Sequence, residues 1–356
     1  MRILFLVPYP TGKAPSQRFR FEQYLDALRS HGHTFRMASF IDEATWNILY
    51  KPGHALAKVR GIVRGFGRRI IHLLAAPSYD FVFIHREAAP LGPPVLEWLL
   101  AKVLRKRIIY DFDDAIWIPN TSEANRIAAG LKFHHKVEHI CRWAYKNSCG
   151  NAYLAAYARQ FNSAVIVNPT TIDTEHLHNR VRDQVAPGPL IIGWTGTHST
   201  LKYIEPVVPV LVQLEEDGFN FEFRVISNQT PELPLRSLRF VPWCKDTEIA
   251  DLLTFHVGLM PLQDDAWAKG KCAFKALQYM ALGIPALVSP VGINAEVVQD
   301  DYNGYVCHTL ADWHLHLNQL LIDAPHRQTL GVAARATVEQ RYSVRANTAN
   351  FLDLFS

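Results

Sequence analysis

The fold is decided by residues 258–307, which read GLMPLQDDAWAKGKCAFKALQYMALGIPALVSPVGINAEVVQDDYNGYVC. An apolar run over 257–262 predicts the end of a buried strand, and 286–289 predict the next one. Between them a helical pattern covers about 273–282 and stops at a glycine and a proline. A strand, a helix and a second buried strand in this order are typical of an α/β fold with a parallel sheet.

The loop before this helix carries two lysines on either side of a glycine, at Lys269, Gly270 and Lys271. A helix start has N–H groups without partners inside the helix, and it lies at the positive end of the helix dipole. Lysines beside such an end favour an anion such as a diphosphate. The alternative is an ordinary crossover whose lysines lie in water, and these three residues alone favour that alternative.

A larger set of residues in this stretch follows a known pattern. The set is Gly270, Lys271, Phe274, Lys275, Gln278, Tyr279, Met280, Ala281, Gly283, Pro285, Ser289, Gly292, Glu296, Asn303 and Gly304. With these residues the stretch resembles the donor-binding segment of nucleotide-sugar glycosyltransferases of family four, also called glycosyltransferases group 1. The resemblance continues more weakly along nearly the whole chain. It implies the GT-B fold, an α/β fold of two Rossmann-like domains with parallel sheets facing a cleft.

The composition is that of a globular protein with two domains of ordinary size. The chain has 356 residues, of which 49% are hydrophobic and 20% charged, so each domain can bury a core. Five scattered cysteines without a C-x-x-C pair favour a reducing cytoplasm and argue against structural zinc. The first residues lead directly into a strand at 3–7, without a leader pattern, and no apolar run is long enough to cross a bilayer. We therefore expect a cytoplasmic protein.

Two strand–loop–helix patterns begin about one domain apart in the sequence. The first has a strand at 2–8 and a helix from about 17 to 30, and the second has a strand at 190–193 and a helix from about 201 to 218. Further buried strands are predicted at 81–85, 107–111, 164–167, 221–226 and 257–260. Ligands in such sheets bind at the carboxyl ends of the strands.

The repeated opening predicts an N-terminal Rossmann-like acceptor-side domain over 1–185 and a C-terminal Rossmann-like nucleotide-sugar-binding domain over 186–340. The segment 183–189, which is rich in proline and polar residues, is predicted to be the linker between the two domains. The remaining residues, 341–356, predict a helix, and the resemblance implies that this helix returns to the first domain.

The donor site must supply positive potential, because negative charge grows on the diphosphate as it leaves the sugar. Lys271 is the first choice for this catalytic role and Lys275 the second, although Lys275 can equally lie on an exposed helix face. The resemblance adds Phe274, Gln278 and Glu296 as donor-binding residues. Gln278 stands where the family has a glutamate on the ribose, and its amide can still bond ribose hydroxyls. Glu296 can instead be a carboxylate that stabilises a helix start.

The chain departs from the family pattern at two places. Gly270 stands where the family has the glutamate that contacts the donor sugar, and Trp194 stands where it often has an arginine on the diphosphate. After Trp194, the residues Thr195, Gly196 and Thr197 offer hydroxyls and backbone N–H groups at a helix start, so we expect them to bind the donor.

Two strand ends of the first domain carry the acceptor-side candidates. Asp113 and Asp114 follow one predicted strand, and His85 and Arg86 end another. Asp113 is the candidate catalytic base beside the acceptor hydroxyl, Arg86 is a candidate for binding phosphate, and His85 and Asp114 are expected on the acceptor side. The alternatives are a structural pair of Arg86 with Glu87 or with Asp113, and a capping role for the carboxylates. The resemblance implies retention, in which the departing phosphate accepts the proton.

Arg18, which follows the first strand, is a further acceptor-side candidate. The motif Asp111-Phe112-Asp113 also matches the metal motif of GT-A glycosyltransferases. A GT-A enzyme would leave the second strand–helix pattern and the lysines near 271 unexplained, so we expect no metal.

Residues 56–73 predict an amphipathic helix. Its apolar residues recur at spacings of three and four, Arg60, Arg64 and Arg68 lie on the opposite face, and no acidic residue occurs between Glu43 and Asp80. Such a helix can lie in the interface of an anionic membrane. The alternative is a helix packed on the sheet with its arginines in water.

The sequence therefore predicts a metal-independent, retaining glycosyltransferase that moves a sugar from an NDP-sugar to a glycan or lipid-linked acceptor, in bacterial surface polysaccharide or glycolipid synthesis. The NDP-sugar is a co-substrate, and neither a cofactor nor a nucleic-acid partner is expected. The helix at 56–73 would place the enzyme on the inner face of the cytoplasmic membrane. A GT-B sugar-nucleotide epimerase and a non-catalytic sugar-nucleotide-binding scaffold are the alternatives.

Overall fold

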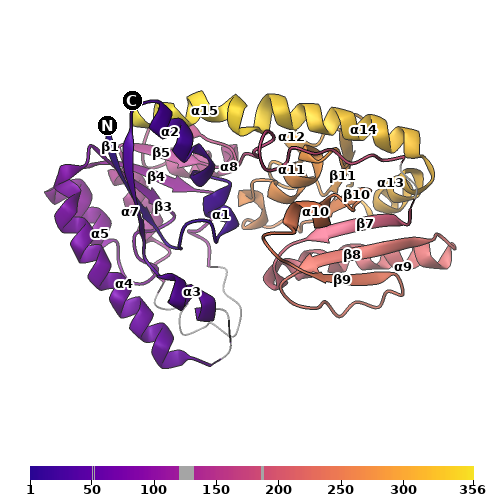
Figure 1. The fold of residues 1–356 in the computed structure, drawn as a ribbon, viewed down its shortest axis with the longest axis horizontal. Coiled ribbons are helices and arrows are strands. Elements are labelled where there is room, and N and C mark those ends of the chain that lie inside the picture. Colours follow the sequence, from indigo (N-terminus) through magenta and orange to yellow (C-terminus); the bar gives the residue numbers. More distant parts are fainter. Residues whose placement is uncertain (50, 52, 120–131, 186–187) are drawn as a thin grey trace. The chain divides into compact units, whose positions relative to one another are not determined.

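A computed structural model describes residues 1–49, 51, 53–119, 132–185 and 188–356. The chain divides into two compact units (Figure 1). Unit 1 holds Met1–Thr170 and Asn347–Ser356, and unit 2 holds Thr171–Ala346. Each unit is built on a parallel sheet of its own, as expected for an α/β protein with two Rossmann-like domains.

Unit 1 has a six-stranded parallel sheet with the order β2-β1-β3-β4-β5-β6. Its strands are β1 (Arg2–Val7), β2 (Thr34–Ser39), β3 (Phe81–His85), β4 (Arg107–Phe112), β5 (Lys146–Cys149) and β6 (Val165–Val167). In the register of the sheet Leu6 pairs with Ile84, and His85 pairs with Asp111. The carboxyl ends of β1, β3 and β4 therefore meet at one edge of the sheet, where the acceptor-side candidates were expected.

The helical segments of unit 1 before the crossover are α1 (Pro15–Arg18), η1 (Glu22–Tyr24), α2 (Leu25–Ser30), α3 (Glu43–Leu49), α4 (Ala55–Ala75), η2 (Ala76–Ser78), α5 (Val95–Trp98), η3 (Leu99–Val103), α7 (Lys136–Trp143) and α8 (Ala152–Arg159). The single helix predicted over 17–30 is broken into α1, η1 and α2. Gln17 and Arg20 turn inward there, and their side chains bond the loop after β1 and the end of β4 instead of lying on a regular helix surface.

The helix α4 packs on unit 1 by a side that the sequence did not predict. Its buried residues are Gly61, Gly65, Arg69 and His72, whereas most of its large apolar side chains are exposed. Arg68 is half-buried and pairs with Asp42 at 3.0 Å. The helix thus packs on unit 1 by its glycine side, with Arg60 and Arg64 exposed, because glycines without a Cβ let this side approach the core closely.

Unit 2 has a second six-stranded parallel sheet, with the order β12-β11-β10-β7-β8-β9. Its strands are β7 (Leu190–Thr195), β8 (Phe221–Ser227), β9 (Leu238–Pro242), β10 (Val257–Met260), β11 (Ala286–Val288) and β12 (Gly304–Val306). Its helical segments are η5 (His198–Tyr203), η6 (Glu205–Val207), α9 (Val208–Glu216), α10 (Glu248–Leu252), η7 (Ala268–Gly270), α11 (Phe274–Ala281), α12 (Asn294–Val297), α13 (Leu310–Ile322), α14 (Ala324–Thr337) and η8 (Val338–Tyr342). The helix predicted over 273–282 is α11, while the one predicted over 201–218 begins as the 3-10 turns η5 and η6.

The chain passes from unit 1 to unit 2 between Thr170 and Thr171 and returns at Asn347. The linker expected at 183–189 lies within unit 2, and its residues 186–187 are outside the described part of the chain. The last helical stretch comprises α15 (Val344–Leu352) and η9 (Asp353–Phe355). Phe351 of α15 stacks on Tyr24 of unit 1 with ring centroids 4.4 Å apart. Aromatic rings from the end of the chain thus complete the core of unit 1.

Candidate functional site

The loop before α11 is held in a fixed shape by its own polar groups. The Asp265 carboxylate accepts a hydrogen bond of 2.7 Å from the backbone N–H of Ala268, and Lys269 pairs with Asp264 at 3.0 Å. Gly292 has φ +59°, and a Cβ there would lie 2.8 Å from the carbonyl oxygen of Lys269. Only glycine fits this position, because the loop after β11 packs closely against the loop before α11 that carries Lys269 and Lys271, here called the lysine loop.

Ala273 stands directly before α11 with φ +53°, in the left-handed region. A non-glycine residue in this region costs on the order of 1 kcal/mol, and the surrounding structure must hold it there. The turn at Ala273 starts α11 three residues after Lys271, whose backbone is extended. The sequence therefore fixes where the positive end of α11 lies relative to the lysine.

Two lysines converge on one aromatic ring at this place. The Nζ of Lys271 lies 5.7 Å from the centroid of the Tyr203 ring, and the Nζ of Lys202 lies 5.3 Å from it. Lys275, on the first turn of α11, has its Nζ 5.5 Å from the ring of the buried Trp194. Lys271 thus lies beside η5, together with Lys202, and Lys275 lies beside the end of β7.

The loop after β7 uses its backbone donors within the protein. The N–H of Thr195 donates to the Tyr279 hydroxyl at 3.0 Å, and the N–H of Gly196 donates to the Ile226 carbonyl at 3.0 Å. Thr195 and Gly196 therefore do not present these N–H groups to a ligand, contrary to the expectation from the sequence. The hydroxyl of Thr197 is exposed and lies 3.0 Å from that of Ser199.

The remaining donor-binding candidates differ in burial. Phe274 is half-buried at the first position of α11, and Gln278 is 2% exposed one turn further on. Among the described residues, the Gln278 Nε2 has no hydrogen-bond partner, which is uncommon for a buried amide. A ligand hydroxyl would satisfy it. Glu296 lies exposed on α12. Burial of the Tyr342 side chain raises the pKa of Tyr342, and the negative charge of Glu296 adds to this rise.

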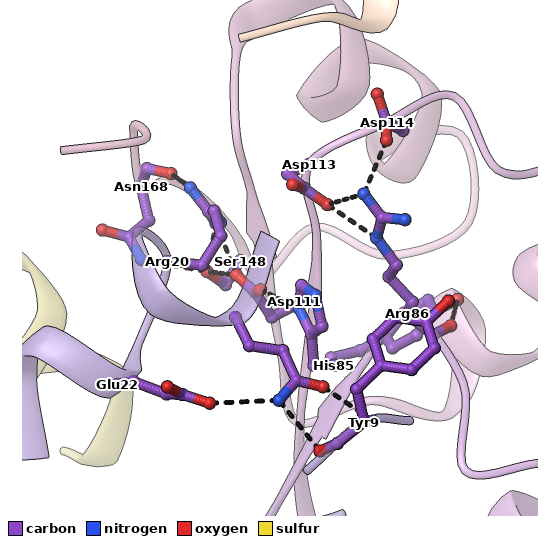
Figure 2. Close-up of polar contacts among 12 residues, drawn as sticks. Tyr9, Arg20, Glu22, His85, Arg86, Asp111, Asp113, Asp114, Ser148 and Asn168 are labelled. Carbon is purple, nitrogen blue, oxygen red and sulfur yellow. Dashed lines mark hydrogen bonds and ion pairs between the residues drawn. The ribbon is translucent and has the colours of Figure 1, made fainter. Parts of the chain in front are cut away.

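In unit 1 an arginine that follows β3 binds two carboxylates that follow β4 (Figure 2). The Arg86 Nε donates to Asp113 at 2.8 Å, and its second nitrogen donates to Asp114 at 2.6 Å. Arg86 has φ +60°, and its backbone is held by the Asp111 carbonyl and the Tyr110 hydroxyl. Burial opposes its charge, but the two carboxylates outweigh burial and raise the pKa of Arg86. The structural pair considered for Arg86 and Asp113 is therefore present.

Asp111 is saturated by buried partners. It accepts hydrogen bonds from the His85 Nδ1 at 2.8 Å, from the Ser148 hydroxyl at 2.7 Å, and from Arg20. Burial alone would raise the pKa of Asp111, but Arg20 and His85 hold it well below its usual range. Since Asp111 faces Arg20 and Asp113 faces Arg86, the Asp-x-Asp sequence does not bring two unpaired carboxylates together.

His85, which was expected on the acceptor side, is fully buried. Its ring packs against Phe21 with centroids 5.3 Å apart. Because the Asp111 carboxylate can only accept, the Nδ1 of His85 that faces it carries a proton. Within the described part of the chain Nε2 has no hydrogen-bond partner. His85 thus orients Asp111 from the inside of unit 1.

Arg20 is the arginine that reaches the strand ends, while Arg18 lies 5.0 Å over the Phe19 ring. Arg20 is 1% exposed and also donates to the carbonyl of Asn168. The signal for Arg20 was its spacing: Gln17, Arg20 and Tyr24 follow at three and four residues, and all three are buried.

Sequence reasoning also missed a brace in the loop after β1, by which we mean the hydrogen bonds that Gln17 and Glu22 make with the backbone of this loop. Gln17 exchanges hydrogen bonds with the backbone of Tyr9 and donates to Glu22 at 3.1 Å. Glu22 also accepts from the N–H of Gly12 at 2.8 Å. Burial raises the pKa of Glu22 in spite of these bonds. The brace fixes the loop that begins at the carboxyl end of β1, beside Arg86 (Figure 2).

Residues 227–337 match the family described as glycosyl transferases group 1. The matched part lies in unit 2 and contains the lysine loop, α11 and α12. The resemblance to this family stated from the sequence is therefore confirmed over these residues. No curated protein sequence matches the chain.

Solved structures share the fold over nearly the whole chain. Sucrose-phosphate synthase from Thermosynechococcus elongatus is 14% identical with a TM-score of 0.71, over 100% of this chain and 98% of that one. Anabaena HepE in complex with UDP-glucose is 15% identical with a TM-score of 0.65, over 99% of each chain. The lipopolysaccharide outer core galactosyltransferase WaaB is 14% identical with a TM-score of 0.64, over 99% of each chain. The likeness confirms the predicted GT-B fold.

Proposed function

We propose that this chain is a glycosyltransferase that moves a sugar from a nucleoside diphosphate sugar to a glycan or lipid-linked acceptor. The observation that carries the proposal is the glycosyl transferases group 1 match over 227–337, which includes the lysines at the start of α11. HepE, which shares the fold, has been solved with UDP-glucose. That complex supports a nucleoside diphosphate sugar as the donor here.

In this proposal the donor diphosphate lies at the start of α11. Lys271 and Lys202 supply positive charge as negative charge grows on the leaving nucleotide, and Lys275 adds to it. The buried Nε2 of Gln278 donates to a ribose hydroxyl. Gly270 provides no side chain for the sugar, so the donor-sugar contact of the family is absent from this position.

We assign acceptor orientation to Arg86, together with Asp113 and Asp114. Because Asp113 is already bonded to the guanidinium of Arg86, we assign proton acceptance to the departing phosphate rather than to Asp113. Transfer then proceeds with retention, as the resemblance implies. An ordered arginine–carboxylate group can position acceptor hydroxyls and exclude competing orientations.

We further propose that the acceptor belongs to bacterial surface polysaccharide or glycolipid synthesis and that the enzyme works at the inner face of the cytoplasmic membrane. WaaB, which shares the fold, acts on the lipopolysaccharide outer core, and this supports such an acceptor. Among the described residues, none of the helices is long and apolar enough to span a membrane, so the proposed attachment is peripheral.

Incubation of the purified protein with a panel of NDP-sugars, followed by product analysis, tests the proposal. Transfer to an acceptor, or slow hydrolysis of one donor, supports a glycosyltransferase, and the anomeric configuration of the product decides retention. Recovery of an epimerised donor would instead assign a sugar-nucleotide epimerase. Tight donor binding without any turnover would assign a non-catalytic sugar-nucleotide-binding scaffold. Gly270 is the reason to test this alternative, because it lacks the side chain that contacts the donor sugar in the family.

We also propose that transfer needs no metal, because the lysines and the helix start already supply positive charge beside the diphosphate. Turnover should then persist in excess EDTA. Loss of turnover in EDTA that magnesium or manganese restores would contradict this proposal and return the Asp111–Asp113 motif to consideration.

A further inference from the structure

One side of α4 presents a row of large apolar side chains. The row, here called the α4 stripe, consists of Leu56, Val59, Val63, Phe66, Ile70 and Leu74, with exposed fractions from 37% for Phe66 to 88% for Leu56. Spacings of three and four residues place these side chains on one side of the helix. The stripe extends over about 27 Å along α4, and an exposed apolar surface of this kind marks an interaction site. Figure 1 shows α4 running along one side of unit 1.

The opposite side of α4 prevents the helix from turning to bury the stripe. A Cβ on Gly61 would lie 2.4 Å from the Thr45 hydroxyl, and a Cβ on Gly65 would lie 2.6 Å from the Phe40 ring. Both positions therefore need glycine, and any larger side chain rotated into them would collide with the core.

Arg69 locks the same rotation of the helix. Its buried guanidinium donates to the carbonyl oxygens of Val7 and Ala38, each at 2.8 Å, and to that of Ala88. These carbonyls lie at the end of β1, in β2 and in the loop after β3. Turning α4 would leave a buried cation without partners, which costs several kcal/mol. The outward direction of the stripe is thus a stable feature of unit 1.

The charge beside the stripe has one sign. At about 100° per residue, Arg60 and Arg64 lie on one flank of the stripe, and both are exposed. No acidic residue occurs from 44 to 79. Arg68 does not contribute to this surface, because it pairs with Asp42. The exposed side of α4 is therefore apolar and flanked by cations.

We infer that the α4 stripe inserts into the interface of a membrane that contains anionic lipids, with Arg60 and Arg64 at the headgroups. Apolar side chains in the acyl boundary with basic residues beside them are the pattern of helices that lie in a membrane surface. A second copy of the chain is a poorer occupant, because a helix pair without acidic residues would bring arginines of the same sign together. The inference names the surface for the peripheral attachment proposed above, and it does not require the proposed sugar transfer.

Sedimentation of the full-length protein with lipid vesicles tests the inference. We expect binding to vesicles of phosphatidylcholine mixed with phosphatidylglycerol, and much weaker binding to phosphatidylcholine alone. The triple variant Val59→Ser/Val63→Ser/Ile70→Ser should lose at least about tenfold in vesicle affinity, because three exposed apolar side chains no longer enter the acyl boundary. Circular dichroism and the melting temperature of the variant should stay those of the wild type, since these side chains are exposed.

Two further variants separate the parts of the surface. Arg60→Gln/Arg64→Gln should weaken binding to the anionic vesicles and reduce its dependence on salt, while leaving the weak binding to neutral vesicles unchanged. The matched control Leu315→Ser/Ile322→Ser/Val332→Ser removes exposed apolar side chains from α13 and α14 of unit 2. It should bind anionic vesicles as the wild type does.

A direct probe reports insertion at the stripe. Cys244 is the exposed cysteine among the free thiols, so a Val63→Cys change in a Cys244→Ser background gives one accessible site for an environment-sensitive dye. Its emission should shift to the blue with anionic vesicles. The inference is overturned if wild type and the triple serine variant sediment alike, or if the dye reports no change. It is also overturned if analytical ultracentrifugation shows a dimer that the triple serine variant abolishes, because the stripe then faces a second copy. None of these readouts needs enzyme activity.

Discussion

Three arginines of unit 1 are used to hold the backbone and carboxylates in place. Arg20 and Arg86 bind Asp111 and Asp113 at the ends of the strands, and Arg69 binds carbonyl oxygens below α4. Burial lowers the pKa of Arg69 to about 9. Arg69 therefore keeps its charge at neutral pH, although burial disfavours the charged form. If such a buried cation is removed, the buried acceptors that it bonds are left without donors, and the folded state is destabilised.

We predict that Arg69→Gln lowers the free energy of unfolding by about 2–4 kcal/mol, because carbonyl groups at the ends of two strands and a loop lose their donors. Urea unfolding measures this change. Arg64→Gln on the same helix is the matched control, since Arg64 is exposed and its replacement should change stability by less than about 0.5 kcal/mol. Equal stability of the two variants would contradict the assigned role of Arg69.

Lys271 and Lys269 stand two residues apart but differ in their surroundings. Lys271 lies over Tyr203 beside Lys202, whereas Lys269 pairs with Asp264. Lys271→Ala should lower turnover by at least about tenfold, on the order of 1.4 kcal/mol of transition-state stabilisation. Lys269→Ala should keep turnover within about twofold of the wild type. Steady-state kinetics with the donor found in the screen decides, and unchanged turnover in a folded Lys271→Ala protein removes Lys271 from the site.

Two buried histidines make the fold sensitive to acid. Burial lowers the pKa of His72 and of His256 to about 4, and the positive charges of Arg69 and Arg182, respectively, make the next largest contribution. Their usual value is 6.5, so the unfolded chain binds more protons than the folded one between about pH 6.5 and pH 4. Stability is therefore complete above about pH 6.5 and falls as the pH decreases toward 4.

Urea unfolding at about pH 7 and about pH 4.5 measures this loss. The loss should be smaller in His256→Gln than in the wild type, because glutamine cannot be protonated but can still accept the hydrogen bond from the Ile191 N–H. His176→Gln is the control, since His176 is exposed. A pH dependence that His256→Gln leaves unchanged would show that other groups cause it.

At the scale of elements, the sequence predicts strands best where they are apolar on both faces. The predictions 81–85 and 257–260 coincide with β3 and β10. The strand β5 (Lys146–Cys149) was missed because its central residues are polar. Asn147 and Ser148 are buried there only because they bond the Cys141 carbonyl and the Asp111 carboxylate. Such tertiary bonds leave no periodic signal in the sequence.

Two segments that were predicted to be helices, 56–73 and 17–30, show a second limit of sequence patterns. The apolar period of α4 predicted a helix correctly, but the direction of packing followed the glycines and Arg69. The helix predicted over 17–30 was broken because Gln17 and Arg20 serve the strand ends. The residues that position the unit 1 site were thus the least visible in the sequence, whereas Lys271 and Gln278 could be selected through the resemblance.

The last helix makes a prediction at this scale. Phe351 of α15 is fully buried against Tyr24 and Phe83 of unit 1. Phe351→Ala should lower the free energy of unfolding of unit 1 by about 3–5 kcal/mol, through lost burial and the remaining cavity. Arg345→Ala on the same helix should have little effect, because its pair with Glu175 is exposed. Differential scanning calorimetry compares the two, and a melting curve of Phe351→Ala like that of Arg345→Ala would contradict the packing.

At the scale of the whole molecule, each unit has its own sheet and its own candidate site. The donor candidates all lie in unit 2, and the carboxylate–arginine group lies in unit 1. Hydrogen exchange with and without UDP should therefore show slower exchange in the segments 194–203 and 268–278, because a bound nucleotide stabilises only the state that binds it. Exchange around 85–86 and 111–114 should change less. Protection restricted to unit 1 would contradict the assignment of the donor to unit 2.

The path of the chain through the units also determines the order in which they can be completed during translation. Unit 1 consists of the first 170 residues and the last ten, whereas unit 2 is one continuous segment. A ribosome must synthesise all of unit 2 before it reaches Phe351 and Phe355, which close the aromatic core of unit 1. Unit 2 can fold as soon as it emerges, because domains generally fold as units. Until Phe351 and Phe355 are synthesised, Tyr24 and the aromatic rings beside it lack these two partners, and transiently exposed apolar surface of this kind is prone to aggregation.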